Sequence, residues 1–219
     1  CSFMTRSYGN AVSSYDAVIT KKLTGADYAM YQKSVILGLQ GKTEDKIALL
    51  KSLSVSYPSS IYSDDALYEL GVAYLSIPSY NEAAEAFNRV ISKYPAGSYV
   101  VKSHLKLGLI FFNLDNNKNA LEEYRTVLTK YPNSPERADA LNGVKEVFTA
   151  NGDAQGYVNF VKSVPNINIS DATQDSVAYL AAEANYSKGN CSQAISEFGN
   201  YLKSFPQGAF ALHAHFYRA

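Results

Sequence analysis

Few side chains in this sequence have the types and the spacing that catalysis or metal binding requires. His213 and His215 would share one side of a strand, as two metal ligands do, but on a helix they point about 200° apart. The neighbours Asp64 and Asp65 could act as paired carboxylates in acid–base catalysis. They also follow Ser63, and hydroxyl and carboxylate groups in this order favour the start of a helix. We therefore interpret the histidines as packing or surface residues and the aspartates as helix caps.

Other features resemble parts of known sites but are incomplete. The segment 115–117 begins like a calcium loop, yet it lacks the glycine and the closing glutamate of such a loop, so we interpret it as a turn. Cys1 and Cys191 have no further thiol or histidine at metal-binding spacing. Cys1 would suit a lipid-modified first residue, but the polar linker that usually follows such a residue is missing. The sequence therefore predicts no catalytic residue, no metal site and no cofactor.

The composition is that of an ordinary globular chain. Its 219 residues include 20 Lys and Arg and 20 Asp and Glu, so the formal net charge is zero. A neutral chain lacks the electrostatic attraction on which nucleic-acid and anionic-membrane binding depend. No segment approaches the ~18 apolar residues of a membrane helix. We therefore expect neither nucleic acid as a partner nor direct insertion of this segment into a membrane.

A repeat organises the sequence. An aromatic residue followed by proline recurs at an interval of 37 residues, once at twice that interval: Tyr57-Pro58, Tyr94-Pro95, Tyr131-Pro132 and Phe205-Pro206. Upstream of each proline the same residue types return at fixed offsets, and in one unit they are Leu70, Gly71, Tyr74, Ala83 and Phe87. Such self-similarity is typical of an array in which one structural unit is stacked on the next.

The spacing within each unit predicts two amphipathic helices. Apolar residues at i, i+3, i+4, i+7 and i+8 form one face of each helix. Small residues such as Gly71 and Ala83 would let the two helix axes approach closely. The proline then ends the second helix, because the residue before a proline is disfavoured in the α region. We predict an all-α fold in which antiparallel helix hairpins stack to bury their apolar faces.

These offsets resemble the pattern of the tetratricopeptide repeat (TPR), which implies a right-handed α-solenoid. The longer pattern Tyr-Pro-x-Ser, then Ala and Leu-Gly, is carried by residues 57–60, Ala66 and Leu70-Gly71 and in part by residues 131–134 and Ala138. It is similar to repeats of bacterial cell-envelope proteins, namely the periplasmic coordinator of the Tol-Pal system and the TPR lipoprotein of the barrel-assembly machinery. This resemblance implies a periplasmic or outer-membrane-associated location, with the cytoplasm as the alternative.

We predict one solenoid over residues 1–219, with five full repeats and incomplete units at both ends. The repeats span 24–58, 59–95, 96–132, 133–169 and 170–206. Residues 3–23 resemble a second helix without its first, and residues 207–219 the beginning of a first helix, as in an excerpt of a longer array. The first repeat is degenerate, with Ser34 and Lys46 in place of the small residues. In the fourth, Pro165 should end the second helix early and leave 166–174 as a polar connector.

The TPR resemblance also implies a partner-binding surface on the concave face, lined by first helices. Carried over position by position, it selects Tyr31, Val35, Tyr68, Val72, Leu75, Leu105, Leu109, Phe112, Asn142, Glu146, Thr149, Tyr179, Glu183 and Tyr186. The lysine and asparagine with which chaperone-binding TPRs hold a carboxylate are absent, so we expect aromatic and aliphatic side chains to hold a ligand. The same residues could instead pack between neighbouring helices, and Tyr80 and Tyr99 could staple successive hairpins.

The sequence thus predicts a non-catalytic scaffold that binds a peptide segment or a partner domain. The alternative is a docking or regulatory segment of a larger envelope enzyme whose catalytic domain lies outside this chain. A purely structural spacer is a third hypothesis, and it would bind no ligand.

Overall fold

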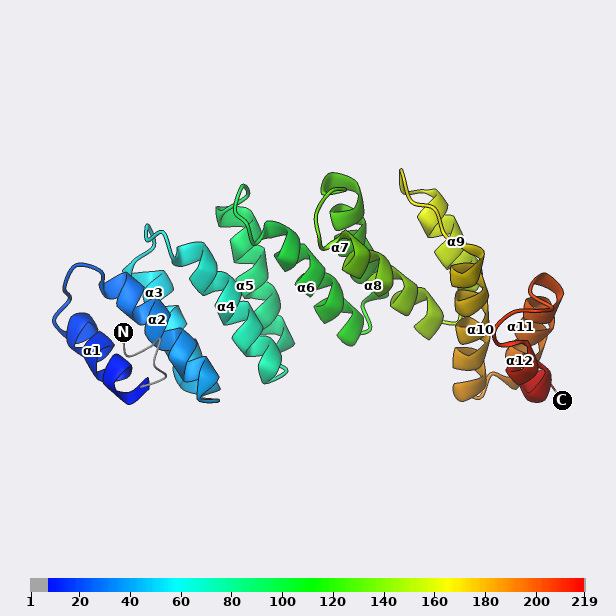
Figure 1. The fold of residues 1–219 in the computed structure, drawn as a ribbon, viewed down its shortest axis with the longest axis horizontal. Helices are drawn as coiled ribbons and strands as arrows, with labels where there is room; N and C mark the ends of the chain where they lie inside the picture. The colour runs from blue at the N-terminus through cyan, green and yellow to red at the C-terminus, as the bar shows by residue number, and fades with distance from the viewer. Residues whose placement is uncertain (1–7, 219) are drawn as a thin grey trace. The chain divides into compact units, whose positions relative to one another are not determined.

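The computed structural model describes residues 8–218, and this part of the chain forms twelve helices and no strand (Figure 1). The predicted all-α fold class is therefore confirmed. The helices are α1 (Tyr8–Thr20), α2 (Ala26–Leu39), α3 (Thr43–Ser56), α4 (Ser63–Ser76), α5 (Tyr80–Lys93), α6 (Val100–Asn113), α7 (Asn117–Lys130), α8 (Arg137–Ala150), α9 (Ala154–Lys162), α10 (Asp171–Ser187), α11 (Cys191–Ser204) and α12 (Ala211–Arg218). Cys1 and the first residues of the predicted helix 3–23 lie outside the described residues.

The helices keep the period of the sequence. The second helices of the five pairs begin at intervals of 37 residues, at Thr43, Tyr80, Asn117, Ala154 and Cys191. One helix pair lies within each of the spans predicted as repeats. The short turns inside the pairs also follow the period, and Gly41, Gly152 and Gly189 have φ angles of 71°, 72° and 76° there. These left-handed angles suit glycine, because it has no Cβ to clash with the following carbonyl oxygen.

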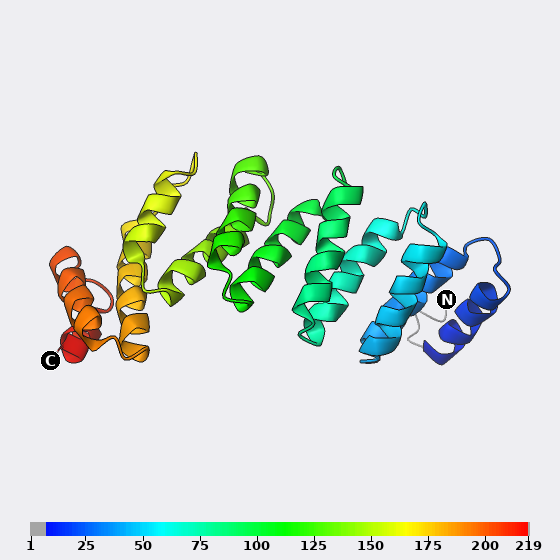
Figure 2. The same cartoon turned by 180° about the vertical axis from the view of Figure 1, so that it is seen from behind.

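The chain divides into two compact units, residues 1–110 and residues 111–219. In the first unit, α4 and α5 lie side by side and run antiparallel in both views (Figures 1 and 2). Leu67 and Phe87 are buried between the helices of this unit. A Cβ built at Gly71 would lie 2.7 Å from the ring of Phe87. The glycine therefore provides the space that the aromatic side chain fills.

The second unit contains an irregular helix pair, α8 and α9. Pro165 stands where α9 would continue, and α9 ends at Lys162 after nine residues. The prediction that the proline ends this helix early is confirmed, but the predicted connector 166–174 is wrong. The connector is 163–170, because Ser170 caps the next helix: its Oγ accepts from the backbone N–H of Thr173 at 3.2 Å. Helix α10 therefore starts at Asp171, before the position that the repeat would give.

A buried carboxylate links α10 to the later helices of the second unit. Asp175 accepts the hydroxyl of Tyr201 at 2.5 Å and the backbone N–H of Ala209 at 2.8 Å. The Tyr201 oxygen in turn accepts from the N–H of Phe210 at 3.1 Å. Because buried polar groups are costly unless they are hydrogen-bonded, these bonds stabilise the connection that leads into α12.

Candidate functional site

A groove lies between the first two helix pairs of the first unit. Its volume is about 550 Å³. It is lined by Tyr31, Val35, Gly38 and Leu39 of α2, Thr43 and Lys46 of α3, and Glu69, Val72, Ala73 and Ser76 of α4. Three residues predicted to bind a partner, Tyr31, Val35 and Val72, thus come together here. We call this space the first-unit groove.

Two charged residues that the sequence analysis did not assign to the site meet in the first-unit groove. Lys46 Nζ lies 2.6 Å from Glu69 Oε2, and the lysine side chain is only 13% exposed. Its stem passes Gly38, where a Cβ would lie 3.3 Å from Lys46 Cδ. A partly buried ammonium requires such a partner, because an unpaired buried charge is costly. The two charges therefore neutralise each other within the groove.

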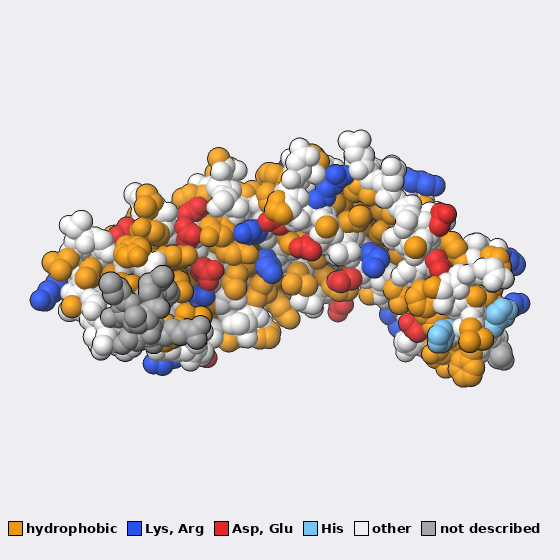
Figure 3. Space-filling model, viewed as in Figure 1, with side chains coloured by type: hydrophobic (Ala, Val, Ile, Leu, Met, Phe, Trp, Pro, Cys, Tyr) orange, Lys and Arg blue, Asp and Glu red, His pale blue; other side chains and the backbone are white. Residues whose placement is uncertain are grey.

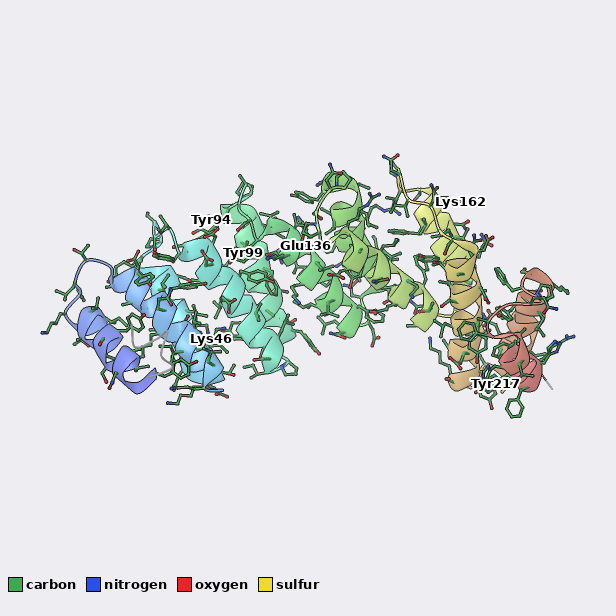
Figure 4. The ribbon with its side chains drawn as sticks, in the orientation of Figure 1. Lys46, Tyr94, Tyr99, Glu136, Lys162 and Tyr217 are labelled. Carbon is green, nitrogen blue, oxygen red and sulfur yellow. The ribbon has the colours of Figure 1, made fainter. Side chains whose placement is uncertain are left out.

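A hydrogen-bonded cluster borders this groove at the beginning of α4. Tyr99 Oη donates to Asp65 Oδ1 at 2.7 Å, and the same carboxylate acts on the hydroxyl of Tyr31. Burial, and then the negative charges of Asp65, Glu69 and Asp64, raise the pKa of Tyr31 to about 12. Tyr99 lies in the connection between α5 and α6, so its predicted role as a staple to the preceding helix pair is confirmed. Lys46 and Tyr99 lie towards opposite ends of the helices of this unit (Figure 4).

The predicted capping role of Ser63, Asp64 and Asp65 is wrong in its detail. Helix α4 begins at Ser63, and Tyr62 is its N-cap residue. The side chain at this N-cap position makes no capping hydrogen bond. Ser63 Oγ instead donates to the backbone oxygen of Tyr57 at 2.9 Å. The aspartates lie in the first turn, where the helix dipole still favours negative charge.

The other predicted residues of the first unit lie outside the groove. The ring of Tyr68 stacks on that of Tyr99 with 4.5 Å between centroids, and Tyr31 itself stacks on Tyr62 at 5.6 Å. These contacts give both predicted tyrosines a structural role. The remaining three positions differ in exposure: Leu75 and Leu105 are half-buried, and Leu109 is 36% exposed.

The second unit has a groove of its own between α8 and α10. Its volume is about 350 Å³, and its lining consists of Phe112, Glu146, Thr149, Ala150, Leu180, Glu183, Ala184 and Ser187. Four of these, Phe112, Glu146, Thr149 and Glu183, were selected from the sequence. We call this space the second-unit groove. Unlike the first, it has two carboxylates and no lysine or arginine in its lining.

Three predicted residues of the second unit lie outside its groove. Tyr179 is only 5% exposed: its ring stacks on Phe210 at 4.5 Å, and its hydroxyl donates to Glu183 Oε1 at 3.0 Å. This burial removes Tyr179 from the predicted contact surface. Burial, the hydrogen bond to Glu183 and the charge of that carboxylate raise the pKa of its hydroxyl. Asn142 is exposed, and Tyr186 is exposed beside the ring of Tyr217 at 4.8 Å.

The grooves offer surfaces for contact. Among residues 8–218, no three His, Cys, Asp or Glu side chains are grouped so that they could hold a metal ion. His213 and His215 are exposed on α12, and Cys191 is an exposed free thiol. No helix of the described residues is long and apolar enough to cross a membrane. Charges of both signs are interspersed with apolar side chains over the face seen in Figure 3.

Sequence comparison identifies part of the array. Residues 65–96 and 102–134 match the family model of the tetratricopeptide repeat. These two segments are similar to tetratricopeptide repeats. They include most of α4 to α7, and the remaining TPR-like pairs of α2–α3, α8–α9 and α10–α11 keep the same spacing of second helices. The comparison with curated proteins gives no significant match.

Three solved structures of different proteins are similar to this chain in fold. A tetratricopeptide repeat protein from Parabacteroides merdae has 13% identity and a TM-score of 0.55, covering 99% of this chain and 93% of that one. YrrB, described as a TPR protein with an unusual peptide-binding site, has 17% identity and a TM-score of 0.57, covering 93% and 98%. The Naa15/Naa10 complex bound to HypK has 15% identity and a TM-score of 0.60, covering 99% and 31%. At these identities the similarity shows the TPR fold alone.

The sequence contains a signal for this charged pair. Lys46 occupies the repeat position of Ala83 and Ala120, which are both fully buried. A lysine at a core position predicts an acidic partner on a neighbouring helix, because its charge must be compensated there. Glu69 of α4 is that partner.

Proposed function

We propose that this chain is a non-catalytic scaffold that binds a peptide segment or a partner domain through the face formed by its first helices. The observation that carries the proposal is the presence of a groove between successive first helices in each unit, at positions selected from the TPR pattern. Each groove combines an apolar floor with a few polar groups, as peptide-binding surfaces do. The description of YrrB as a peptide-binding TPR protein supports the same reading.

A selection from a random peptide library displayed on phage tests the proposal. Selected peptides should bind the unchanged chain, and groove variants should bind them at least tenfold more weakly, because an apolar anchor of this size contributes about 1.5–3 kcal/mol when fully buried. The variants are Val72→Ser for the first-unit groove and Phe112→Ser for the second. Binding is measured by fluorescence anisotropy after circular dichroism has shown unchanged helicity.

The chain offers a matched control for each variant. Val55, in the same unit as Val72, is 78% exposed, and Phe216, in the same unit as Phe112, is 76% exposed. Val55→Ser and Phe216→Ser remove the same side chains outside the grooves and should leave binding unchanged. A library that yields no ligand, or ligands that tolerate both groove variants as well as the controls, would contradict the proposal and favour a structural spacer.

We further propose a location in the bacterial cell envelope. This proposal rests on the Tyr-Pro-x-Ser pattern of the repeats and on its resemblance to envelope TPR proteins. Fractionation of cells that express the full-length protein should place it in the periplasm or with the outer membrane. Recovery from the cytoplasm alone would contradict it.

A further inference from the structure

We propose that the second-unit groove binds a cationic peptide segment, with an apolar side chain on the groove floor and a lysine or arginine between Glu146 and Glu183. The inference rests on the proposed scaffold function and specifies the chemistry of the partner. It is carried by three features of the groove: the repeat position of the two glutamates, their lack of a cationic partner, and the shape of the apolar floor.

The two carboxylates stand at equivalent positions of neighbouring first helices. Glu146 on α8 and Glu183 on α10 are 37 residues apart, one repeat length, and both line the groove. The same position carries Val35 and Val72 in the first unit. Glutamates therefore replace valines at this repeat position in the second-unit groove and make it acidic.

Neither glutamate has an ion-pair partner in the part of the chain that the structure describes. The ion pairs of Lys33 with Asp16 and of Lys46 with Glu69 both lie in the first unit. Glu183 accepts the neutral hydroxyl of Tyr179 at 3.0 Å. A cation entering this groove would meet two carboxylates without displacing an intramolecular cation, and charge-assisted hydrogen bonds to carboxylates are stronger than neutral ones.

One lysine lies at the margin of the groove and has a different contact. Lys188 follows α10, and its Nζ donates to the backbone oxygen of Ala150 at 2.6 Å. Ala150 is the last residue of α8, and the carbonyl end of a helix attracts cations. The ammonium group of Lys188 is thus held at the helix end, and the two carboxylates still outnumber it.

The floor between the carboxylates is apolar and partly made of small residues. Phe112 and Leu180 provide large apolar surfaces, and Ala150 and Ala184 leave room beside them. An apolar side chain of the partner would bury its surface here, while a neighbouring lysine or arginine extends its charge towards the glutamates. The first-unit groove lacks this combination, because Lys46 already pairs with Glu69 there.

Synthetic peptides of matched composition test the inference. The probe is a fluorescein-labelled twelve-residue peptide of leucine, serine and lysine, and its partner peptide has glutamine in place of every lysine. We expect the lysine peptide to bind the complete chain at least fivefold more tightly in fluorescence anisotropy. The double variant Glu146→Gln/Glu183→Gln should lower that affinity roughly three- to thirtyfold and weaken its dependence on salt, because surface ion pairs contribute modestly and are screened.

A second double variant separates the groove from general charge effects. Glu122 and Asp139 are exposed in the same unit and do not line the groove. Glu122→Gln/Asp139→Asn removes the same net charge and should leave the affinity within twofold of the unchanged chain. Equal loss in both double variants would mean that only overall charge matters, and the inference would be wrong.

The outcomes distinguish this inference from the broader proposal. If library peptides bind through Val72 or Phe112 but the lysine and glutamine peptides bind equally, the cationic specificity is wrong and the scaffold function stands. If the lysine peptide binds and the glutamate double variant binds it unchanged, the site assignment is wrong. If neither the library nor the synthetic peptides bind, both proposals fail.

Discussion

Two buried serines of the first unit show how the same side chain can have opposite effects on stability. Ser103 in α6 is completely buried, and its Oγ has no hydrogen-bond partner among the described residues. Ser63 in α4 is 2% exposed, and its Oγ donates to the oxygen of Tyr57. The equivalents of Ser103 in other repeats include Ala66 and Ala140. At this position Ser103 thus carries a hydroxyl that the alanines of other repeats lack.

We predict that Ser103→Ala raises the free energy of unfolding by about 1 kcal/mol, because it removes an unsatisfied buried polar group. Ser63→Ala should lower it by about 1 kcal/mol, since the oxygen of Tyr57 would lose one of its two donors and keep only the N–H of Ser60. Urea denaturation of both variants gives the two values. If Ser103→Ala destabilises the chain as much as Ser63→Ala does, the Ser103 hydroxyl has a partner and the explanation is wrong.

The raised pKa of Tyr31 makes a prediction about alkaline pH. The folded chain holds the proton of this hydroxyl up to about pH 12, whereas an unfolded tyrosine loses it near pH 10. Between these values the unfolded state binds fewer protons, so the free energy of unfolding must fall as pH rises. In Tyr31→Phe this fall should be less steep, and the difference between variant and unchanged chain should be constant below pH 9. An identical slope in both proteins would contradict the assignment.

At the scale of the element, the turns inside the helix pairs have a residue with a positive φ angle at the same repeat position. In three of these turns the residue is a glycine, at positions 41, 152 and 189. Asp115 stands at the same repeat position with φ of 55°. The left-handed conformation costs a residue with a Cβ about 1–2 kcal/mol, although aspartate tolerates it better than most.

We predict that Asp115→Gly raises the free energy of unfolding by roughly 0.5–1 kcal/mol, because it relieves this cost. The reverse substitution is available at Gly189, where a Cβ would have nothing within 4 Å. Gly189→Ala should therefore lower the stability by about 1 kcal/mol through the backbone alone. Thermal denaturation followed by circular dichroism measures both. A loss of stability in Asp115→Gly would show that the aspartate side chain stabilises the turn.

The elements were the most predictable part of this chain, and their side-chain contacts the least. The recurring Tyr-Pro pairs predicted the helix pairs because periodic burial and proline geometry act locally. The start of α10 was missed because it depends on the Ser170 cap, which is not part of the repeat. In the candidate site, the TPR pattern selected residues of both grooves but also the buried Tyr179. Its burial depends on Phe210, which comes from the following repeat and does not belong to the pattern of its own helix.

At the scale of the whole molecule, a repeat array is stabilised by contacts between neighbouring repeats. A substitution in one repeat should therefore destabilise that repeat and its neighbours most. The chain offers a symmetrical test of this expectation. Phe87 in the unit 1–110 and Phe198 in the unit 111–219 are both completely buried. They stand at the same repeat position, three repeats apart. Their substitution by alanine removes the same side chain from equivalent cores.

We predict that Phe87→Ala lowers the protection of backbone amides against hydrogen exchange mainly within residues 8–110, and that Phe198→Ala does so mainly within residues 111–218. Each substitution should cost about 3–5 kcal/mol locally, since a buried aromatic side chain is replaced by a cavity. Hydrogen exchange detected by mass spectrometry locates the loss along the chain. Equal loss of protection in both units for both variants would show that the array unfolds as one cooperative block. The two-unit division would then have no energetic meaning, because stability would be shared over the full chain and local terms would no longer describe it.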